Sequence, residues 1–419
     1  MKIAVIGAGI AGMSAAYYLS KKYEIHLFES SERLGGHTNT VAVQALQQNY
    51  LIDTGFIVFN SKNYPFFMKL MNELGVEYQN SHMSFSVKVE ENGLEYNGTS
   101  INSLFCQRKN IFNFKFYSLI KDILRFNKEA THYYLQQIHE SKTKIESMSI
   151  EEFASLNRYS KEFVEYYLMP MGAALWSASR GEMKKFPLDF FVRFFYHHGM
   201  LSVDARPQWY VIKGGSNSYI PKLTAPFASN IHLNSNISKV KRSNNSIEIS
   251  HDEQVSYFDH VVFATHADQT LLLLSDPTND EKSILGAFSY RPNDVLLHTD
   301  VSVLPKSKLG WASWNYYVAK MERQRVAVTY NMNILQSLKS STTFLVSLNM
   351  DDLIDPSKVL KKISYSHPVF DLNASNSQKR WREISGKDHI HYAGAYWGNG
   401  FHEDGVKSAH QVAQMLGAL

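Results

Sequence analysis

Three glycines near the start of the chain, Gly7, Gly9 and Gly12, stand at the spacing G-x-G-x-x-G. They follow an apolar stretch at residues 3–6 that predicts a strand, and they open a predicted helix over residues 11–21. Gly7 permits a tight turn, Gly9 lets the backbone approach a pyrophosphate, and Gly12 lets the helix pack closely on the strand. The first N–H groups of a helix are free to bind phosphate, so the pattern predicts a dinucleotide site.

An acidic residue supports this prediction. Glu29 ends the next predicted strand, residues 25–28, about 20 residues beyond the glycines. A carboxylate at this place accepts hydrogen bonds from the adenosine ribose and repels the 2′-phosphate of NADP. The fingerprint with its strand, helix and acidic residue therefore indicates NAD or FAD.

A second glycine pair, Gly35 and Gly36, comes soon after Glu29 and is followed by His37. Backbone without side chains lets this segment reach the pyrophosphate from its other side. Residues 29–37 resemble the flavin-containing amine oxidase superfamily, which also includes carotenoid desaturases and protoporphyrinogen oxidases. The resemblance favours FAD over NAD.

Four later segments resemble further elements of that superfamily in the right order: residues 52–55, 213–216, 393–394 and 399–406. Val240 stands where the superfamily uses a backbone contact to adenine. The resemblance implies FAD contacts from Gly7, Gly9, Ile10, Ala11, Gly12, Glu29, Ser30, Arg33, Gly35, Gly36, His37, Thr38, Thr54, Gly55, Phe56, Val240, Gly394, Ala395, Phe401, His402 and Val406.

Three departures from the superfamily bear on the cofactor. His37 replaces an arginine of many members, and an imidazole is a weaker phosphate partner than a guanidinium. Ala395 replaces an acidic residue, which removes one cofactor hydrogen bond. Monoamine oxidases hold covalent flavin on a cysteine, and here no cysteine lies near the C-terminal motif. We therefore expect non-covalent FAD.

Residues 170–177, 311–316, 329–333 and 401–405 resemble a narrower family of amine-oxidase-like NAD/FAD-binding proteins. Its members are often encoded beside, or fused to, cyclopropane-fatty-acyl-phospholipid synthases. The resemblance implies a lipid substrate and a lipid methyltransferase as a partner.

The flavin itself carries the chemistry, and no protein residue is identified as catalytic. Pocket candidates are Phe401, His402, Trp397, Tyr396, Trp314 and Tyr316. No metal site is expected, because residues 402–404 precede a helix in the flavin-facing segment. The pair at residues 197–198 ends a predicted helix, where histidines complement the helix dipole.

A single nucleotide fingerprint indicates that the substrate reduces the flavin, since a second site for NAD(P)H is absent from the sequence. The first hypothesis is an FAD-dependent oxidoreductase that removes a hydride from an apolar substrate, a fatty-acyl chain or lipid. The alternatives are a flavin amine oxidase, an FAD-dependent double-bond isomerase, and a non-catalytic flavin-bound partner of a lipid methyltransferase.

Composition agrees with a soluble globular enzyme, because 44% of the 419 residues are hydrophobic and 20% are charged. A net charge of +4 falls far short of the basic field of a nucleic-acid binder, so no nucleic acid is expected as a partner. Cys106 is the single cysteine, which fits a reducing compartment. No apolar run reaches the ~20 residues that span a bilayer. We expect a cytoplasmic protein, with any membrane contact peripheral at the inner surface.

The predicted fold is α/β, a Rossmann-type FAD-binding domain interrupted by a mixed α+β substrate domain. The FAD-binding domain is expected to comprise residues 1–62, 206–283 and 386–419, and the substrate domain residues 63–205 and 284–385. In the substrate domain, residues 83–96 predict a hairpin, and residues 110–140 and 150–200 predict helices. Residues 294–298, 311–318 and 325–331 alternate like strands of an antiparallel sheet.

Residues 107–128 interleave bases with aromatic side chains, a pattern typical of helices that lie on anionic membrane surfaces. Phe112 and Phe116 are expected to insert, and Lys115, Lys121 and Arg125 to attract anionic lipid. The alternative is a helix of the substrate domain with a solvated basic face.

Overall fold

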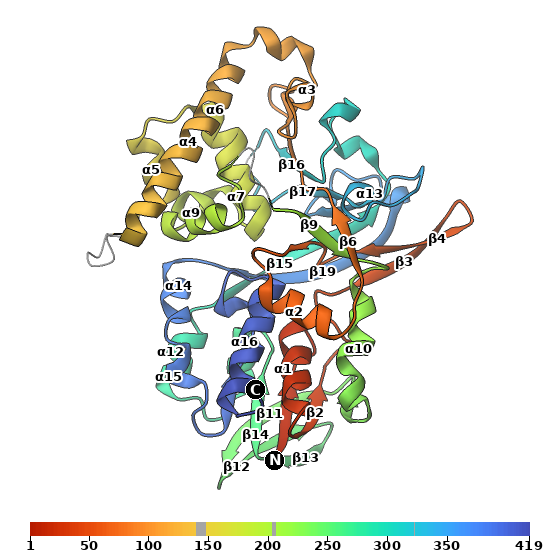
Figure 1. The fold of residues 1–419 in the computed structure, drawn as a ribbon, viewed down its shortest axis with the longest axis vertical. Helices are drawn as coiled ribbons and strands as arrows, with labels where there is room; N and C mark the ends of the chain where they lie inside the picture. The colour runs from red at the N-terminus through yellow and green to blue at the C-terminus, as the bar shows by residue number, and fades with distance from the viewer. Residues whose placement is uncertain (140–147, 203–206, 322) are drawn as a thin grey trace.

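The structure is a computed structural model that describes residues 1–139, 148–202, 207–321 and 323–419. In Figure 1 both chain ends lie in the lower half, and α4 (Phe114–His139) lies in the upper half. The lower half is the Rossmann half. The upper half is built from the long insertions between the Rossmann segments.

Five parallel strands form the sheet of the Rossmann half, in the order β10-β2-β1-β14-β20. They are β10 (Ile231–His232), β2 (Glu24–Phe28), β1 (Lys2–Ile6), β14 (His260–Phe263) and β20 (Ile390–Tyr392). Val5 pairs with Leu27 on one side and Val262 on the other, and all three are fully buried. Continuous apolar runs suit parallel strands that are covered on both faces. The predicted discontinuous Rossmann sheet is confirmed.

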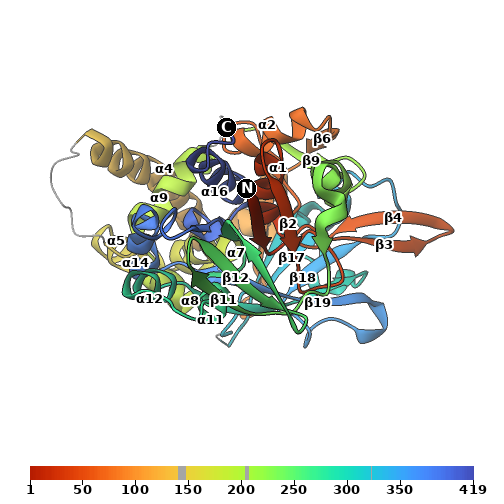
Figure 2. The same cartoon turned by 90° about the horizontal axis from the view of Figure 1, so that it is seen from below.

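Helices and a small second sheet cover the Rossmann sheet. On one face α1 (Ile10–Ser20) and α16 (His402–Met415) pack against each other. The other face carries an antiparallel sheet, visible in Figure 2, of β11 (Ile237–Ser243), β12 (Ser246–His251) and β13 (Gln254–Phe258). Further helices around this half are α10 (Ile220–Thr224), α11 (Ala267–Leu273) and α12 (Asn279–Leu285).

Seven strands form the sheet of the upper half, in the order β19-β15-β18-β17-β16-β7-β8. They are β19 (Val359–Val369), β15 (Ser289–His298), β18 (Leu345–Leu348), β17 (Val328–Asn331), β16 (Trp314–Val318), β7 (Phe85–Val89) and β8 (Glu95–Asn97). The hairpin predicted at residues 83–96 is confirmed as β7 and β8. The sheet is mixed rather than antiparallel throughout, because β16 pairs with β7 in parallel, although more than 200 residues of both halves separate the two strands in sequence.

A helical layer lies beside this sheet, as predicted for residues 110–140 and 150–200. It contains α4, α5 (Ile150–Leu156), α6 (Lys161–Phe163), the π-helical turn η2 (Val164–Leu168), α7 (Met169–Trp176), α8 (Arg180–Lys185) and α9 (Leu188–His197). Two short segments border α4 at its start, α3 (Ile101–Leu104) and η1 (Arg108–Phe112). Smaller elements are β3 (Thr40–Ala45), β4 (Gln48–Asp53), β5 (Phe59–Asn60), β6 (Tyr78–Ser81), β9 (Trp209–Ile212) and α13 (Met332–Leu335).

Three helices pack on a different half of the molecule from the one that the predicted domain boundaries give them. α2 (Pro65–Glu73) packs on α16, and α14 (Leu372–Gln378) and α15 (Trp381–Ile384) pack on α12. Phe67, Leu70 and Trp381 belong to the buried core of the Rossmann half. These helices therefore join that half, although the predicted boundaries place them in the substrate domain; the boundaries otherwise stay a prediction.

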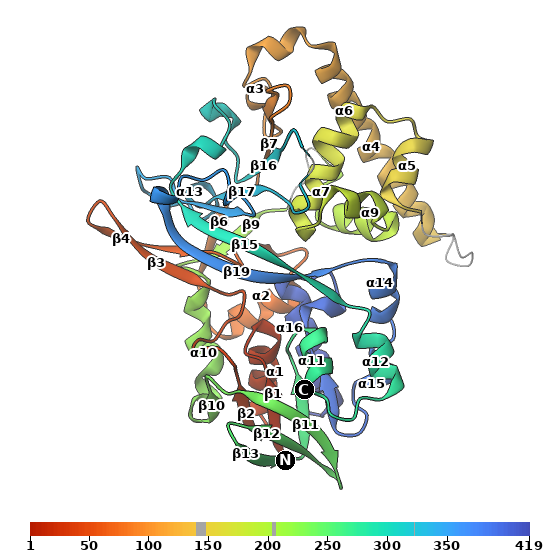
Figure 3. The same ribbon diagram turned by 180° about the vertical axis from the view of Figure 1, so that it is seen from behind.

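The two long strands β15 and β19 run between the halves, as Figure 3 shows from behind. Tyr290 and Val295 of β15 and residues 363–368 of β19 line the cavity described below. Among the described helices, none is both long and apolar enough to cross a membrane.

Candidate functional site

One cavity of about 1240 Å³ runs from the Rossmann sheet into the upper half. Pockets for a single small ligand measure about 300–1,000 Å³, so this volume accommodates a cofactor and a substrate together. Its wall contains the glycine fingerprint at one end and side chains of α3 and α4 at the other.

The glycine fingerprint has the geometry that a bound pyrophosphate requires. Gly7 turns with φ +97°, and a Cβ on Gly12 would lie 1.8 Å from the carbonyl oxygen of Gly7, so α1 packs directly on the turn. A Cβ on Gly9 would meet no atom within 4 Å and would instead occupy the cavity. No described side chain caps the N-terminus of α1, so its N–H groups are free to bind phosphate.

Glu29 lies at the edge of the same end of the cavity. Its Oε2 accepts a hydrogen bond from the N–H of Ala8 at 2.7 Å, and its Oε1 accepts one from Ser31 N–H at 2.9 Å. Ser30 lines the cavity beside it. The carboxylate is therefore fixed in the cavity wall, where it would accept hydrogen bonds from the ribose of a bound dinucleotide.

The second glycine pair folds back over the first. Gly35 has φ +110° and donates its N–H to the carbonyl of Ala8 at 2.9 Å. A Cβ on Gly36 would lie 3.2 Å from the Cα of Gly9. Arg33 holds this loop, because its guanidinium donates to the Gly36 carbonyl at 2.7 Å. Backbone thus borders the pyrophosphate position from two sides.

His37 lines the cavity with a polar atom that lacks a partner. Its Nε2 is buried and makes no hydrogen bond within the described residues. Its ring stacks on Tyr365 at 4.7 Å between centroids, and burial holds its pKa well below the ordinary value, so the imidazole is neutral. A buried orphan of this kind calls for a ligand atom, which fits a bound cofactor.

The remaining predicted cofactor residues divide into two groups. Those that line the cavity are Ile10, Ala11, Thr54, Gly55, Phe56, Gly394, Ala395, Phe401 and His402. Those that lie behind its wall are Gly12, Thr38, Val240 and Val406. Val240 is fully buried in the β11–β12 pair, and its carbonyl accepts the N–H of Ser275 at 3.0 Å. At this point the cavity wall is formed by residues 235–237, just before and at the start of β11, and Val240 itself does not line it.

The pocket candidates also divide. Trp314 and Tyr396 line the cavity, whereas Trp397 and Tyr316 do not. Trp397 packs on Phe288 at 5.4 Å between ring centroids. Tyr316 is partly buried and packs against the hydrophobic core of the upper half. Trp397 and Tyr316 are therefore packing residues.

His198 caps the end of α9, as predicted, and it also lines the cavity. Its Nδ1 lies 2.9 Å from the carbonyl of Phe194, and burial lowers its pKa to about 4. Phe194 stacks on Phe401 at 5.3 Å, so these rings form one aromatic wall. Its neighbour His197 points away and contacts the hydroxyl of Tyr134 at 2.7 Å. Only packing distinguishes the two adjacent histidines.

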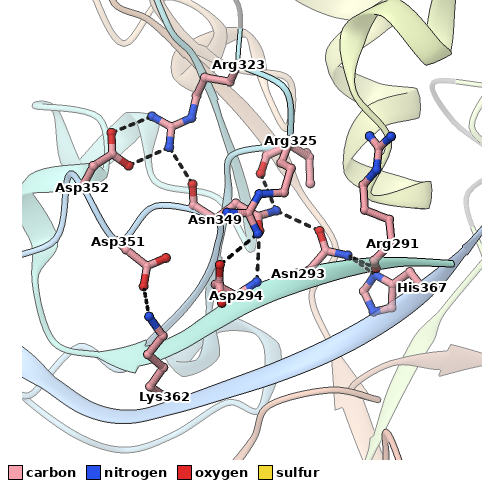
Figure 4. Close-up of polar contacts among 11 residues, drawn as sticks. Arg291, Asn293, Asp294, Arg323, Arg325, Asn349, Asp351, Asp352, Lys362 and His367 are labelled. Carbon is pink, nitrogen blue, oxygen red and sulfur yellow. Dashed lines mark hydrogen bonds and ion pairs between the residues drawn. The ribbon is translucent and has the colours of Figure 1, made fainter.

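His367, on β19, was also not anticipated, and Figure 4 shows the network that orients it. Asn349 Oδ1 accepts the N–H of Asp294 at 3.0 Å, so its Nδ2 donates to Asn293 Oδ1 at 2.8 Å. Asn293 then presents its own Nδ2 to His367 Nδ1 at 3.3 Å, and Ser177 Oγ reaches the same nitrogen at 2.8 Å.

The network determines where the proton of His367 lies. Burial lowers the pKa of His367 to about 4, so its ring is neutral and carries one proton. Donors occupy Nδ1, and the proton therefore sits on Nε2. His367 lines the cavity beside His37, at 5.2 Å between ring centroids. His367 therefore supplies an N–H donor next to the loop of Gly35, Gly36 and His37.

Charged groups are confined to the dinucleotide end. Among the described lining residues, Glu29 and Arg33 are the only members of the Asp, Glu, Lys and Arg types. Of residues 402–404, His402 contacts Thr38, Glu403 accepts the N–H of Phe67 at 2.9 Å, and Asp404 accepts the N–H of Phe401 at 3.0 Å. These side chains diverge, and in the described part of the chain no three metal-binding side chains cluster.

The sequence matches the model of one protein family, described as flavin containing amine oxidoreductase, over residues 10–315. The chain belongs to this family. Its members are oxidoreductases that use FAD, and the glycine turn, the second glycine loop and the orphan nitrogen of His37 fit that cofactor. No curated protein matches the sequence.

Solved structures of similar fold include enzymes that act on different substrates. A CLA-producing fatty acid isomerase from P. acnes has 14% identity and a TM-score of 0.68, covering 99% of this chain and 97% of its own. Cyclohexylamine oxidase from Brevibacterium oxydans has 13% identity and a TM-score of 0.69, covering 99% of both chains. Putrescine oxidase bound to putrescine has 13% identity and a TM-score of 0.71, covering 100% of both. At these identities the likeness shows the two-domain fold.

Proposed function

We propose that this family member removes a hydride from an apolar substrate, a fatty-acyl chain of a lipid. The observation that carries the proposal is the lining of the upper part of the cavity. Apolar and aromatic side chains dominate it, among them Leu104, Ile123, Leu175, Trp176, Trp314 and Leu348. No carboxylate of the described residues faces this part.

The chain's own residues would bind and enclose the reactants. FAD, when bound, would supply the hydride acceptor, and the neighbouring carbon would release a proton to solvent as the double bond forms. The glycine loops and Glu29 would hold its dinucleotide part, while Phe401 and Phe194 exclude water from the reacting end. The Nε2–H of His367 offers a neutral donor beside that end. We also propose that the cofactor is held without a covalent bond.

An amine oxidase is the second candidate. The aromatic wall of Phe401 and Phe194 could hold an alkylammonium by cation–π attraction, and cyclohexylamine oxidase shares the fold. However, an ammonium group would lose its hydration in a wall without a carboxylate, which costs free energy. A double-bond isomerase is the third, supported by the shared fold of the fatty acid isomerase.

An anaerobic titration separates these candidates. Unsaturated fatty acids or phospholipids are expected to bleach the yellow holoprotein, and simple alkylamines are not. Rapid bleaching by amines alone would overturn the proposal in favour of an amine oxidase. A shifted double bond in recovered lipid, without net bleaching, would indicate the isomerase. A flavin that neither compound class reduces would favour a non-catalytic partner of a lipid methyltransferase.

A matched pair of variants on β16 tests the cavity assignment. Trp314→Ala enlarges the proposed acyl pocket and is expected to slow bleaching by lipid at least about tenfold. Tyr316→Phe, two residues along the strand and outside the cavity, is expected to react like the wild type. Equal rates for both variants would contradict the assignment of the pocket.

A further inference from the structure

Large apolar side chains are exposed at the end of the upper half, where α3, η1 and the start of α4 meet (Figure 1). Phe112 is 85% exposed, Phe114 88% and Ile101 81%. We call the set Ile101, Ile111, Phe112, Phe114, Tyr117 and Leu124 the apolar tip. A soluble protein rarely exposes such a group of side chains without a partner to cover it.

The surroundings of the apolar tip are strongly basic. Residues 101–128 contain six Lys and Arg residues and one acidic residue, Asp122. Asp122 is buried and accepts the N–H of Ser160 at 2.7 Å, so it does not offset the exposed bases. Lys109 and Lys121 are exposed and make no ion pair with described residues, whereas Lys115, whose side chain is 81% exposed, lies 3.5 Å from Glu162. Charge therefore favours an anionic partner.

The apolar tip is continuous with the cavity. Ile101 and Leu124 belong to the tip and also line the cavity, together with Leu104, Ile120 and Ile123. Because Ile101 is largely exposed, the cavity reaches the surface here. The tip therefore surrounds an opening that leads toward the Rossmann half.

We propose that the apolar tip docks on the surface of an anionic phospholipid bilayer, so that an acyl chain enters the cavity directly from the lipid. Phe112 and Phe114 insert among the acyl chains, and Lys109, Lys115 and Lys121 attract the headgroups. The entry of an acyl chain into the cavity rests on the proposed function, whereas docking on the bilayer does not.

The structure corrects two residues of the sequence-based expectation for this surface. Phe116 is 1% exposed and packs on Tyr96 at 5.8 Å between ring centroids, so it cannot insert. Arg125 donates to the carbonyl of Asn157 at 2.8 Å and lies 4.1 Å over the ring of Tyr159. It ties α4 to its neighbours instead of facing lipid.

Sedimentation with vesicles tests docking on the holoprotein. At low salt, the wild-type protein is expected to bind vesicles that contain phosphatidylcholine and phosphatidylglycerol. Binding is expected to weaken as the salt concentration rises and to be weak with vesicles of phosphatidylcholine alone. Lys109→Glu, Lys115→Glu and Lys121→Glu together, or Phe112→Ser with Phe114→Ser, are expected to lower binding about tenfold or more. The FAD spectrum and melting temperature report whether each variant is folded.

The controls change exposed apolar and basic side chains elsewhere on the surface. Leu46→Ser replaces a side chain that is 66% exposed on the β3–β4 hairpin, and Lys239→Glu, Lys241→Glu and Lys361→Glu reverse three exposed bases. These controls are expected to bind like the wild type if docking is local to the tip. Controls that lose binding equally would show nonspecific charge attraction and overturn the proposal.

Two other outcomes would overturn docking. One is wild type that ignores anionic vesicles at low salt; the other is a protein dimer that forms through the tip and disappears in the phenylalanine variants. Failure of docking differs from failure of the proposed function. Free fatty acid that reduces the flavin without vesicle binding refutes docking alone, and vesicle binding without any reduction by lipid refutes the substrate alone.

Discussion

The hydroxyl of Thr38 lies 2.9 Å from Nε2 of His402, although 364 residues separate the two in sequence. The same oxygen lies 2.5 Å from the hydroxyl of Tyr219. Thr38 stands behind the cavity wall and His402 lines it, stacked on Phe56 at 3.6 Å between ring centroids. Thr38 therefore orients a ring at the start of α16 that lines the cavity.

Removing the Thr38 hydroxyl tests this role. Thr38→Val leaves His402 Nε2 and the Tyr219 hydroxyl buried without their shared partner, which costs about 1–3 kcal/mol of unfolding free energy. The affinity for FAD is expected to fall as well, because His402 loses its fixed orientation. Urea unfolding and FAD titration measure both. Thr131→Val serves as the control, because among the described residues its hydroxyl bonds only the Asn127 carbonyl. Equal effects of the two variants would contradict the role.

The pH dependence of stability should report His402. Burial lowers its pKa from 6.5 to about 3. Below about pH 6.5 the unfolded chain binds a proton at this residue that the folded protein does not, so unfolding becomes easier as pH falls toward 3, by at most about 1.4 kcal/mol per pH unit. His402→Gln lacks this linkage, and its stability deficit is expected to shrink between pH 6.5 and pH 4.5. A deficit that stays constant over this range in urea unfolding would refute a buried, neutral His402.

The two glycines Gly9 and Gly12 should respond in opposite ways to a side chain. Gly9→Val places its Cβ in open space at φ −70°, so the apoprotein is expected to fold normally but to purify colourless. Gly12→Ala brings a Cβ to 1.8 Å from a backbone oxygen and is expected to destabilise the fold by about 1–3 kcal/mol or more. Absorbance and thermal unfolding by circular dichroism separate the effects. A yellow Gly9→Val protein would contradict the proposed position of the pyrophosphate.

Acid precipitation tests non-covalent attachment of the cofactor. The only cysteine, Cys106, is buried away from the cavity, with its Sγ 3.4 Å from the carbonyl of Glu95. Flavin is therefore expected in the supernatant, and the polypeptide mass is expected to be unmodified. A flavin-sized increase in mass would refute this expectation and direct attention to His37 and His402, which line the cavity.

Much of the dinucleotide end followed from local sequence. The turn at Gly7, the helix after it and the carboxylate of Glu29 depend on backbone conformation and on spacings of a few residues, so each is readable from the chain. The β7–β8 hairpin was readable for the same reason, since a short turn joins its strands.

The substrate end depended on contacts between distant segments. His367 acquires its proton position from Ser177, 190 residues away, and from Asn293, 74 residues away. His198 and His197 are adjacent and chemically identical, yet packing turns one into the cavity and the other outward.

The sequence by itself determined the family, the dinucleotide fingerprint and the alternation of Rossmann segments with insertions, because these are written in short spacings and apolar runs. Only the tertiary structure decided that Phe116 is core while Phe114 is exposed, and that Val240 lies behind the cavity wall. The physical reason is that burial is a property of the whole packed chain: whether a side chain faces core, cavity or solvent depends on segments hundreds of residues away.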